Sequence, residues 1–384
     1  MMKQVDRCQI AVVGGGHAGL LATIVLAAAG FNVRVIDPMG PGRPPASGRT
    51  LAILAGSHAA LRQLGAWRYL AAVAWPVRRV DVRDTASGGH VVYRSSEVGH
   101  EPLAYGVDNS VLRGALSAAV ERDCWVRGSL VSMERRGVLV VDDGRRLRAD
   151  LVIGADGRGS VVRRLAGISI DSLSYRQSAI SFIVAHERDG RHVVMERLRP
   201  QGPLATLPLG RHSSGITWVE ADTRAEAVYR RLRSGDMSLV EAELGSELGS
   251  MHIDGPVQFY PLSAQHARRY VAPGIALIGD AAHGVHPIHA QGFNMGVADI
   301  VALLDVLDDA RRRSLPIGGE AILRYQRARQ SDNASRLRMT DALNRLFSND
   351  IAPLRQGRRL LLDTLAAAGP VRRRAIRHGM RMSA

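Results

Sequence analysis

Cysteine and lysine are both scarce in this sequence, and each shortage excludes a class of protein. Cys8 and Cys124 are the only cysteines and form no CxxC pair, which excludes a disulfide framework and fits a reducing cytoplasm. Lys3 is the only lysine, so the formal net charge of +15 comes from arginines spread along the chain. No basic run is interleaved with aromatic residues as single-strand binders require, and we expect no nucleic-acid partner.

Long apolar runs are lacking as well. The apolar stretch over residues 10–29 is interrupted by four glycines and a histidine, and its uninterrupted part, residues 20–29, is too short to span a bilayer. Repeats and low-complexity tracts are absent too. The sequence contains 46% hydrophobic and 23% charged residues, which is the composition of a folded protein. A length of 384 residues is typical of a protein with two domains.

The N-terminal segment has the pattern of half a βαβ unit. A strand is predicted over residues 9–13, a helix over 17–29 and a second strand over 32–37. The turn between the first strand and the helix reads GGGHAG. This placement of a glycine-rich turn predicts a dinucleotide site, because the start of a helix offers free N–H groups to phosphate.

Individual residues of this unit have distinct expected roles. Gly14 permits the tight turn, Gly16 lets the backbone approach a pyrophosphate, and Gly19 allows the helix to pack closely. Asp37 ends the second strand, where an acid accepts hydrogen bonds from a ribose hydroxyl. This pattern alone does not separate NAD from FAD.

Two later strands also end in a glycine beside an aspartate. The first belongs to DLVIGADGRGSVVRRLAG, in which Asp156 and Gly157 follow a buried strand and Arg163 follows near a helix start. This segment either approaches a ligand or is an ordinary Asp-Gly turn with a capped helix, and Arg163 either meets a phosphate or ties the turn down. The second is IALIGDAAHGVHPIHAQGFNMGVADIVAL, in which a strand over 275–278 delivers Asp280 and a loop leads into a helix near residue 294.

The three motifs, in this order and spacing, resemble the class A flavoprotein aromatic hydroxylases, which share the fold of p-hydroxybenzoate hydroxylase. The resemblance implies that FAD is the cofactor, that Asp280 binds the flavin's ribitol, and that residues 290–294 lie against the flavin's pyrimidine edge. A helix start there stabilises the negative charge of a reduced flavin by about 0.3 to 1 kcal/mol.

Smaller matches extend the resemblance. GRTLAILAGSHAALRQLGAW places Arg49 near the cofactor, and GVDNSVLRGAL contributes Arg113, which is either a cofactor neighbour or a solvated surface residue. Pro287 and His289 are the candidates for a flavin-facing wall at the catalytic centre. The candidates for cofactor contact are Gly14, Gly16, His17, Ala18, Gly19, Asp37, Arg49, Arg113, Asp156, Asp280, Ala290, Gln291, Gly292, Phe293 and Asn294.

His283, His286 and His289 recur every three residues, but we expect no metal there. They fall in a loop, where such spacing does not place side chains on one face, and no Asp, Glu or Cys ligand is spaced to complete a site.

Within the family, the sequence is most similar to the ubiquinone-biosynthesis hydroxylases. RLFSNDIAPLRQGRRLLLDTL resembles their C-terminal signature, and GPLATLPLG resembles a strand of their substrate domain. Family members usually have Gly-Gln-Gly where this sequence has Ala290, Gln291 and Gly292. If position 290 needs a positive φ, alanine there costs about 1 kcal/mol.

The resemblance implies hydroxylation of an aromatic, polyprenylated phenol with O2, after reduction of FAD by NAD(P)H that visits transiently. Two other functions stay open. One is a reductase or dehydrogenase related to the geranylgeranyl reductases, which inserts no oxygen, and the other is a noncatalytic flavin-binding scaffold in a biosynthetic complex.

The predicted architecture is α/β, with a Rossmann-type FAD-binding domain interleaved with an α+β substrate domain on a mainly antiparallel sheet. A hairpin over 125–142, one helix over 225–248 and two C-terminal helices after residue 312 are expected. The FAD-binding parts are residues 1–75, 106–174 and 271–312, the substrate-domain parts 76–105 and 175–270, and the C-terminal helices 313–384.

Residues 354–384 contain eight arginines against Asp363, with Leu360, Leu361, Leu362 and Leu365 supplying an apolar face. This composition is typical of a basic interfacial segment that contacts a membrane or a biosynthetic complex. The alternative is a solvated helix packed on its own domain.

Overall fold

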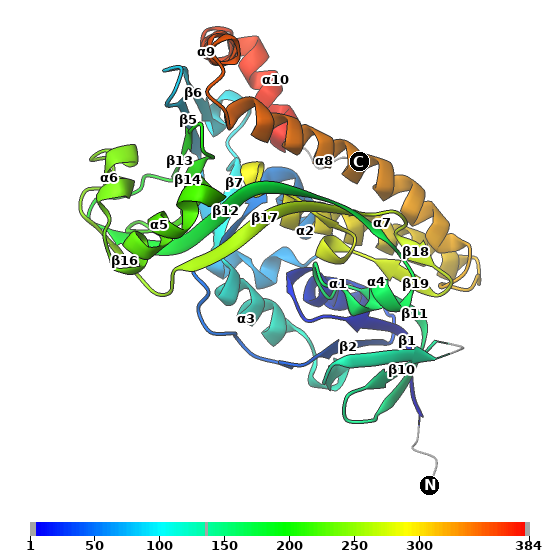
Figure 1. Cartoon of the computed structure of the whole chain (residues 1–384). Coiled ribbons are helices and arrows are strands. Elements are labelled where there is room, and N and C mark those ends of the chain that lie inside the picture. The colour runs from blue at the N-terminus through cyan, green and yellow to red at the C-terminus, as the bar shows by residue number, and fades with distance from the viewer. Residues whose placement is uncertain (1–4, 135–136, 381–384) are drawn as a thin grey trace.

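The computed structural model describes residues 5–134 and 137–380. Its first sheet has a parallel centre in the order β19-β11-β1-β2-β8, with β18 antiparallel at one edge and a β9–β10 hairpin on β11 (Figure 1). The strands are β1 (Val5–Val13), β2 (Val33–Asp37), β8 (Trp125–Arg127), β9 (Leu130–Glu134), β10 (Val138–Val141), β11 (Arg146–Gly154), β18 (Val271–Ala272) and β19 (Ile275–Leu277).

This sheet is the core of the nucleotide-binding part. The last four residues of β1 are all buried, as expected for a parallel strand covered on both faces. Helix α1 (His17–Ala28) packs against both α3 (Asn109–Ala119) and α7 (Gln291–Arg312) beside it, and α4 (Val161–Leu165) follows β11. The predicted strand-turn-helix-strand opening is therefore confirmed.

The second sheet has the order β20-β17-β12-β15-β14-β13-β5-β6, with β16 beside β12. Its pairs are antiparallel except β13 with β5, so the expected mainly antiparallel sheet is confirmed. The strands are β5 (Arg79–Asp84), β6 (His90–Arg94), β12 (Ile170–His186), β13 (Val193–Leu198), β14 (Leu204–Pro208), β15 (Ser213–Ala221), β16 (Met251–Ile253), β17 (Gln258–Ala267) and β20 (His283–Gly284).

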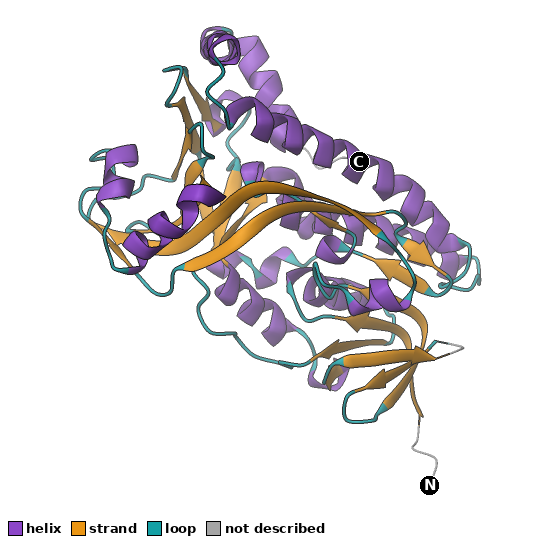
Figure 2. Ribbon diagram, in the orientation of Figure 1, coloured by secondary structure: helices purple, strands orange, loops and turns teal. Residues whose placement is uncertain are grey.

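Figure 2 shows the long strands β12 and β17 crossing the middle of the molecule between the first sheet and the C-terminal helices. One face of this sheet is covered by α5 (Asp222–Arg233) and α6 (Ser238–Leu244), through a core that includes Ile180, Phe182 and Leu232. The single helix expected over 225–248 is wrong, because Gly235, with φ 86°, turns the chain between two shorter helices.

A small third sheet joins the two larger ones, and the sequence patterns had not indicated it. Its order is β3-β7-β4, formed by β3 (Thr50–Leu54), β7 (Ala104–Asp108) and β4 (Trp75–Val77), with α2 (Ala55–Gln63) following β3. The expected hairpin over 125–142 also needs correction. Only β9 and β10 form it, whereas β8 pairs in parallel with β2.

The C-terminal part consists of α8 (Ala321–Phe347), α9 (Ala352–Ala367) and α10 (Gly369–Met380), one helix more than expected among the described residues. Helix α8 ends at Phe347 and helix α9 ends at Ala367. Pro353 and Pro370 lie in the first turns of the helices that follow, where proline is tolerated. Within the described ranges, none of the helices is both long and apolar enough to cross a membrane.

Candidate cofactor site

Four chain segments meet at the carboxyl edge of the parallel sheet. Strands β2, β1, β11 and β19 are neighbours in register, so Asp37, the GGG turn, the Asp156 turn and the Asp280 turn all follow at the same edge. Open α/β sheets bind their ligands at this edge. Long-range pairing thus brings together motifs that are separated by more than a hundred residues in the sequence.

The glycine turn has the geometry that a phosphate-binding turn needs. Gly14 has φ 107°, and a Cβ on Gly19 would lie 1.9 Å from the Gly14 carbonyl oxygen. Gly16 is exposed, a Cβ there would meet nothing within 4 Å, and no side chain caps the start of α1. The N–H groups of the first turn therefore face open space that an anion can enter.

Asp37 and Arg113 fix this turn from outside. The Gly15 N–H donates to Asp37 Oδ2 at 2.7 Å, and Arg113 Nη2 donates to Asp37 Oδ1 at 3.1 Å. Arg113 also donates to the carbonyl oxygens of Gly15, Gly40 and Gly42. Because Arg113 is only 7% exposed, its interpretation as a solvated surface residue is wrong.

Gly15 is a residue whose role the sequence reasoning missed. A Cβ at this position would lie 2.7 Å from the Asp37 carboxyl carbon. The presence of an acid at the end of the second strand is the signal that could have identified it.

His17 begins α1 and lies in an electropositive surrounding. Its Nε2 hydrogen-bonds to the carbonyl oxygen of Asn109 at 2.8 Å, so that nitrogen carries the proton. Burial lowers the pKa of His17, and the charges of Arg49 and Arg113 lower it further, while the Asn109 hydrogen bond and Asp280 oppose the shift. His17 is thus a neutral side chain within electrostatic reach of three other predicted site residues.

The two later aspartates differ in what their carboxylates bind. Asp156 accepts from Ser160 Oγ at 2.5 Å and from the Val161 N–H at 2.6 Å, so it caps α4. The Asp280 side chain is exposed in the turn Gly279–Ala281, and within the described residues its carboxylate has no hydrogen bond or ion pair. Asp280 is therefore the free acceptor of the pair.

Arg163 is buried and donates to the carbonyl oxygens of Ala281 and Arg158, at 2.8 Å each. Of its two expected roles, the geometry supports tying the Asp156 turn to the Asp280 turn.

Two histidines of the loop before α7 have different side-chain partners. His283 is buried and hydrogen-bonded to Asp299 Oδ2 at 2.6 Å, whereas His286 packs edge-on against Tyr175 at 4.9 Å between ring centroids. The side chain of His289 lies outside the described residues. Among residues that are described, no group of three His, Cys, Asp or Glu side chains could hold a metal ion.

The start of α7 is held to the small sheet by Asn294. Its Oδ1 accepts from the Leu54 N–H at 2.9 Å, and its Nδ2 donates to the carbonyl oxygens of Ala52 and Ala290. Ala290 has φ 50° and ψ 37°, the left-handed conformation that favours glycine. Position 290 therefore has a positive φ, and the expected cost of about 1 kcal/mol for an alanine applies there.

The remaining candidates of this helix start have different surroundings. Gln291 is buried and accepts from Arg336 Nη1 at 3.0 Å, and Phe293 lies edge-on to His17 with 6.3 Å between ring centroids. A Cβ at Gly292 would lie 3.9 Å from Val285 Cγ2, an ordinary contact. Pro287 is half-buried, and its carbonyl oxygen accepts from the Ala290 N–H.

The comparisons with known proteins bear directly on this geometry. The FAD binding domain family matches residues 7–315. The ubiquinone hydroxylase UbiL of Rhodospirillum rubrum is 36% identical, and the match covers 97% of this chain and 89% of that protein. The 3-demethoxyubiquinol 3-hydroxylase of Escherichia coli is 35% identical, and the match covers 97% of this chain and 98% of that protein. The chain belongs to this family of FAD-dependent hydroxylases. The resemblance found in the sequence is confirmed.

Solved structures show the same fold. The p-nitrophenol 4-monooxygenase of Pseudomonas putida superposes with a TM-score of 0.83 at 19% identity, covering 99% of this chain and 100% of that one. The FAD complex of a Klebsiella pneumoniae HpxO variant gives 0.77 at 16% identity.

The residues of this hydroxylase fit FAD. The open space over Gly16 accommodates a pyrophosphate at the start of α1, and the free carboxylate of Asp280 can accept hydrogen bonds from a ribitol chain. Arg49 is exposed, with its guanidinium 4.8 Å from the ring centre of Tyr260 on β17. The Arg49 guanidinium thus contacts the second sheet.

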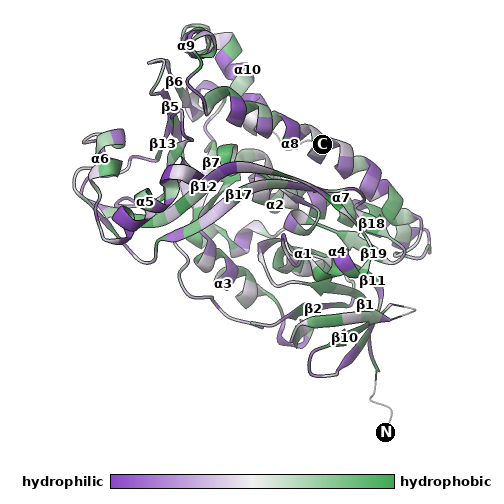
Figure 3. Cartoon of the chain, in the orientation of Figure 1, coloured by the Kyte–Doolittle hydropathy of each residue, from purple (hydrophilic) through white to green (hydrophobic). Residues whose placement is uncertain are grey.

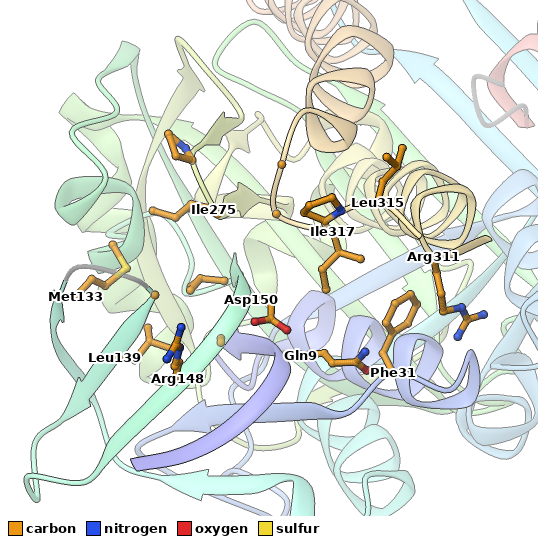
Figure 4. A pocket seen from close by; sticks show the side chains of 18 of the residues that line it. Gln9, Phe31, Met133, Leu139, Arg148, Asp150, Ile275, Arg311, Leu315 and Ile317 are labelled. Atoms are coloured by element: carbon orange, nitrogen blue, oxygen red, sulfur yellow. The ribbon is translucent and has the colours of Figure 1, made fainter. Parts of the chain in front are cut away.

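A large cavity of the hydroxylase lies elsewhere. It measures about 950 Å³ and is lined by residues such as Gln9, Phe31, Asp150 and Ile275 (Figure 4). Gln9 and Ile275 stand before the carboxyl ends of β1 and β19, on the far side from the glycine turn. Choosing the site by cavity volume would thus have led away from the glycine turn. The candidate cofactor site is identified by the backbone of that turn and by the charged side chains around it.

Proposed function

We propose that this FAD-dependent hydroxylase uses NAD(P)H and O2 to hydroxylate the ring of a polyprenylated phenol in ubiquinone biosynthesis. The observation that carries the cofactor part is the free Asp280 carboxylate beside the uncapped start of α1. The names of the relatives at 36% and 35% identity support the substrate class. FAD, when bound, accepts a hydride and activates O2, and the chain supplies binding, orientation and exclusion of water.

In this proposal each predicted residue has a defined task. Gly14, Gly16, His17, Ala18 and Gly19 hold the pyrophosphate, while Asp37 contacts the ribose and Arg113 supports both. Asp280 binds the ribitol, Arg49 lies beside the flavin, and Asp156 acts through the α4 cap. Residues 290–294 place the positive end of α7 against the flavin's pyrimidine edge, which stabilises negative charge.

Apolar side chains of the second sheet would exclude water from the substrate ring. Ala179, Val219 and Leu262 form a buried cluster with Tyr175 and Tyr260, which contact His286 and Arg49 respectively. We propose this cluster as one wall of the substrate cavity, with Pro287 and His289 on the flavin side. A closed apolar wall protects a reactive oxygen species from solvent.

We also propose the interleaved division into FAD-binding, substrate and C-terminal parts given by the sequence, and a cytoplasmic location with contact to a membrane. The test of the function is direct. The purified protein should be yellow, release FAD on denaturation, and consume O2 and NAD(P)H only with a prenylated phenol, giving a product heavier by one oxygen atom.

The two other functions give different results in the same assay. A product that gains two hydrogens without O2 consumption would indicate a reductase. A protein that binds FAD but oxidises no NAD(P)H with any prenylated phenol would indicate a scaffold. Neither has an observation in its favour beyond the alanine at position 290 and the basic C-terminus.

A further inference from the structure

Helix α9 carries an uncharged stripe that faces outward. Leu362 is 3% exposed and Arg358 is fully buried, which defines the side of the helix turned toward the second sheet. Elsewhere on the helix, Leu354, Leu360 and Leu361 are 39%, 70% and 44% exposed. Positions 354, 357, 361 and 364 share one side by their spacing and are leucine, glycine, leucine and threonine. The four leucines expected to form one apolar face are therefore divided between core and surface.

The helix is firmly held, so its exposed leucines are a fixed feature of the surface. Arg358 Nε donates to Asp84 Oδ2 at 2.8 Å, and Leu362 packs in a buried cluster with Val82 and Val91. Arg372, at the start of α10, donates to Glu97 Oε2 at 2.6 Å. In Figure 1 both helices lie at one end of the molecule, above β5 and β6.

The charge around the stripe is mostly positive. Residues 350–384 contain eight arginines and two acids, Asp350 and Asp363. Arg373, Arg374 and Arg377 are exposed on α10, and among the described residues they form no ion pair. Figure 3 shows hydrophobic and hydrophilic segments side by side on α9 and α10. A second copy of this surface would bring like charges together, whereas an anionic surface would complement them.

We propose that α9 and α10 form a docking surface for an anionic membrane. Leu354, Leu360 and Leu361 enter the boundary between headgroups and acyl chains, and the α10 arginines attract the anionic headgroups. The combination of a short exposed apolar stripe with an excess of basic residues fits a helix that lies in the membrane surface rather than across it.

If the proposed function is right, docking by this surface would bring the substrate cavity close to the membrane. A cavity of about 380 Å³ between β12 and the end of α8 is lined by Tyr175, Asn344 and Ser348. Ile351, 56% exposed, follows three residues after Ser348, and Tyr175 contacts His286 of the loop before α7. Docking by α9 holds this cavity next to the lipid in which a polyprenylated substrate dissolves.

Vesicle sedimentation of the FAD-loaded full chain tests the proposal without any turnover. The probes are vesicles of phosphatidylcholine alone and of phosphatidylcholine with about a third phosphatidylglycerol, each at low and at high salt. We expect binding to the anionic vesicles only, weakening as salt rises because charges are screened over about 8 Å at physiological ionic strength. The triple variant R373Q/R374Q/R377Q should bind about a hundredfold more weakly, from roughly a tenfold loss or less per arginine.

The double variant L360Q/L361Q tests the apolar contribution to vesicle binding. Its affinity for the vesicles should fall at least about tenfold at all salt concentrations. The controls are R224Q/R230Q/R233Q on α5 and L315Q/L323Q, which change exposed residues elsewhere and should bind as the original chain does. FAD absorbance and melting temperature show that every variant is folded.

Binding that is equal for both lipid compositions, or unchanged in both α9 and α10 variants, would overturn the proposal, as would no vesicle binding at all. Because no substrate is present, vesicle binding without hydroxylation in the separate turnover assay would refute only the proposed function.

Discussion

At the residue scale, position 290 combines a residue with a Cβ and a backbone conformation that favours glycine. An alanine occupies left-handed backbone, φ 50°, at the point where the loop enters α7. Asn294 binds the carbonyl oxygen of that residue at 2.7 Å and so holds the strained turn in place. Backbone strain of this kind persists only where surrounding contacts determine it.

Replacing Ala290 with glycine should therefore stabilise the protein. Glycine removes the Cβ clash of the left-handed conformation, which is worth up to about 1 kcal/mol of unfolding free energy. Urea unfolding of the FAD-bound protein measures it. The control, Ala302→Gly inside α7, should lose about 1 kcal/mol, since glycine weakens a helix interior. A loss at both positions would show that residue 290 behaves as an ordinary helical residue.

Asp280→Asn should weaken FAD binding by about tenfold to a hundredfold, because a charged acceptor contributes roughly 1.5–3 kcal/mol to a hydrogen bond. Its exposed carboxylate supports no other residue, so the melting temperature of the FAD-free protein should not change. Fluorescence titration with FAD gives the affinity. The comparison variant, Asp156→Asn, should instead lower stability by weakening the α4 cap. Equal FAD affinity in Asp280→Asn and the original chain would remove Asp280 from the site.

At the element scale, Asp299 joins three separate segments. It lies in α7 and accepts from His283, from the Gly279 N–H at 3.0 Å and from Arg329 of α8 at 3.0 Å. Burial alone would raise the pKa of Asp299, but His283, Arg329 and the Gly279 N–H more than offset it and hold that pKa below its ordinary value. The Asp280 turn, the loop before α7 and the long helix α8 thus share one buried carboxylate.

The contacts of Asp299 predict that the stability of the protein falls at acid pH. Because the folded pKa of Asp299 lies below its unfolded value of about 3.9, the carboxylate adds stability that is fully present above that pH and is lost as pH falls through the folded pKa. Asp299→Asn should cost at least about 3 kcal/mol at pH 7, since Arg329 stays buried without this partner. It should also flatten the fall in unfolding free energy below pH 4.

Urea unfolding between pH 3 and pH 7 tests both effects. The exposed Asp305 on the same helix is the control, and Asp305→Asn should change neither the stability nor its pH dependence by more than about 0.5 kcal/mol. If Asp299→Asn kept the full acid dependence, another carboxylate would be responsible for it.

At the scale of the whole molecule, helices α9 and α10 belong with the second sheet and not with the cofactor edge. Arg358 ties α9 to Asp84 of β5, and Arg372 ties α10 to Glu97. The segments that form the FAD edge end with the start of α7, more than fifty residues earlier.

Deleting the residues after Gly369 should accordingly leave FAD affinity unchanged. The truncated protein should lose about 2 kcal/mol of unfolding free energy, because α10 buries Ile376 to 5% exposure and contributes the Arg372 ion pair. FAD titration and urea unfolding of the two chain lengths give both numbers. Loss of flavin on truncation would mean that α10 supports the cofactor domain.

The sequence by itself determined the local features of this protein. The strand, the glycine turn with its tight bend at Gly14, and the helix at the N-terminus depend on residues close together in the chain, so their patterns sufficed. The order of three glycine motifs likewise sufficed for the FAD-binding family.

Tertiary structure decided what depends on partners far along the chain. The burial of Arg113 depends on Gly40 and Gly42, more than seventy residues away, and no helix pattern contains that information. In the β3-β7-β4 sheet, β7 pairs with strands that lie 27 to 58 residues earlier in the chain. Which leucines of α9 face solvent was set by Asp84, because that buried carboxylate fixes Arg358 and thereby the rotation of the helix.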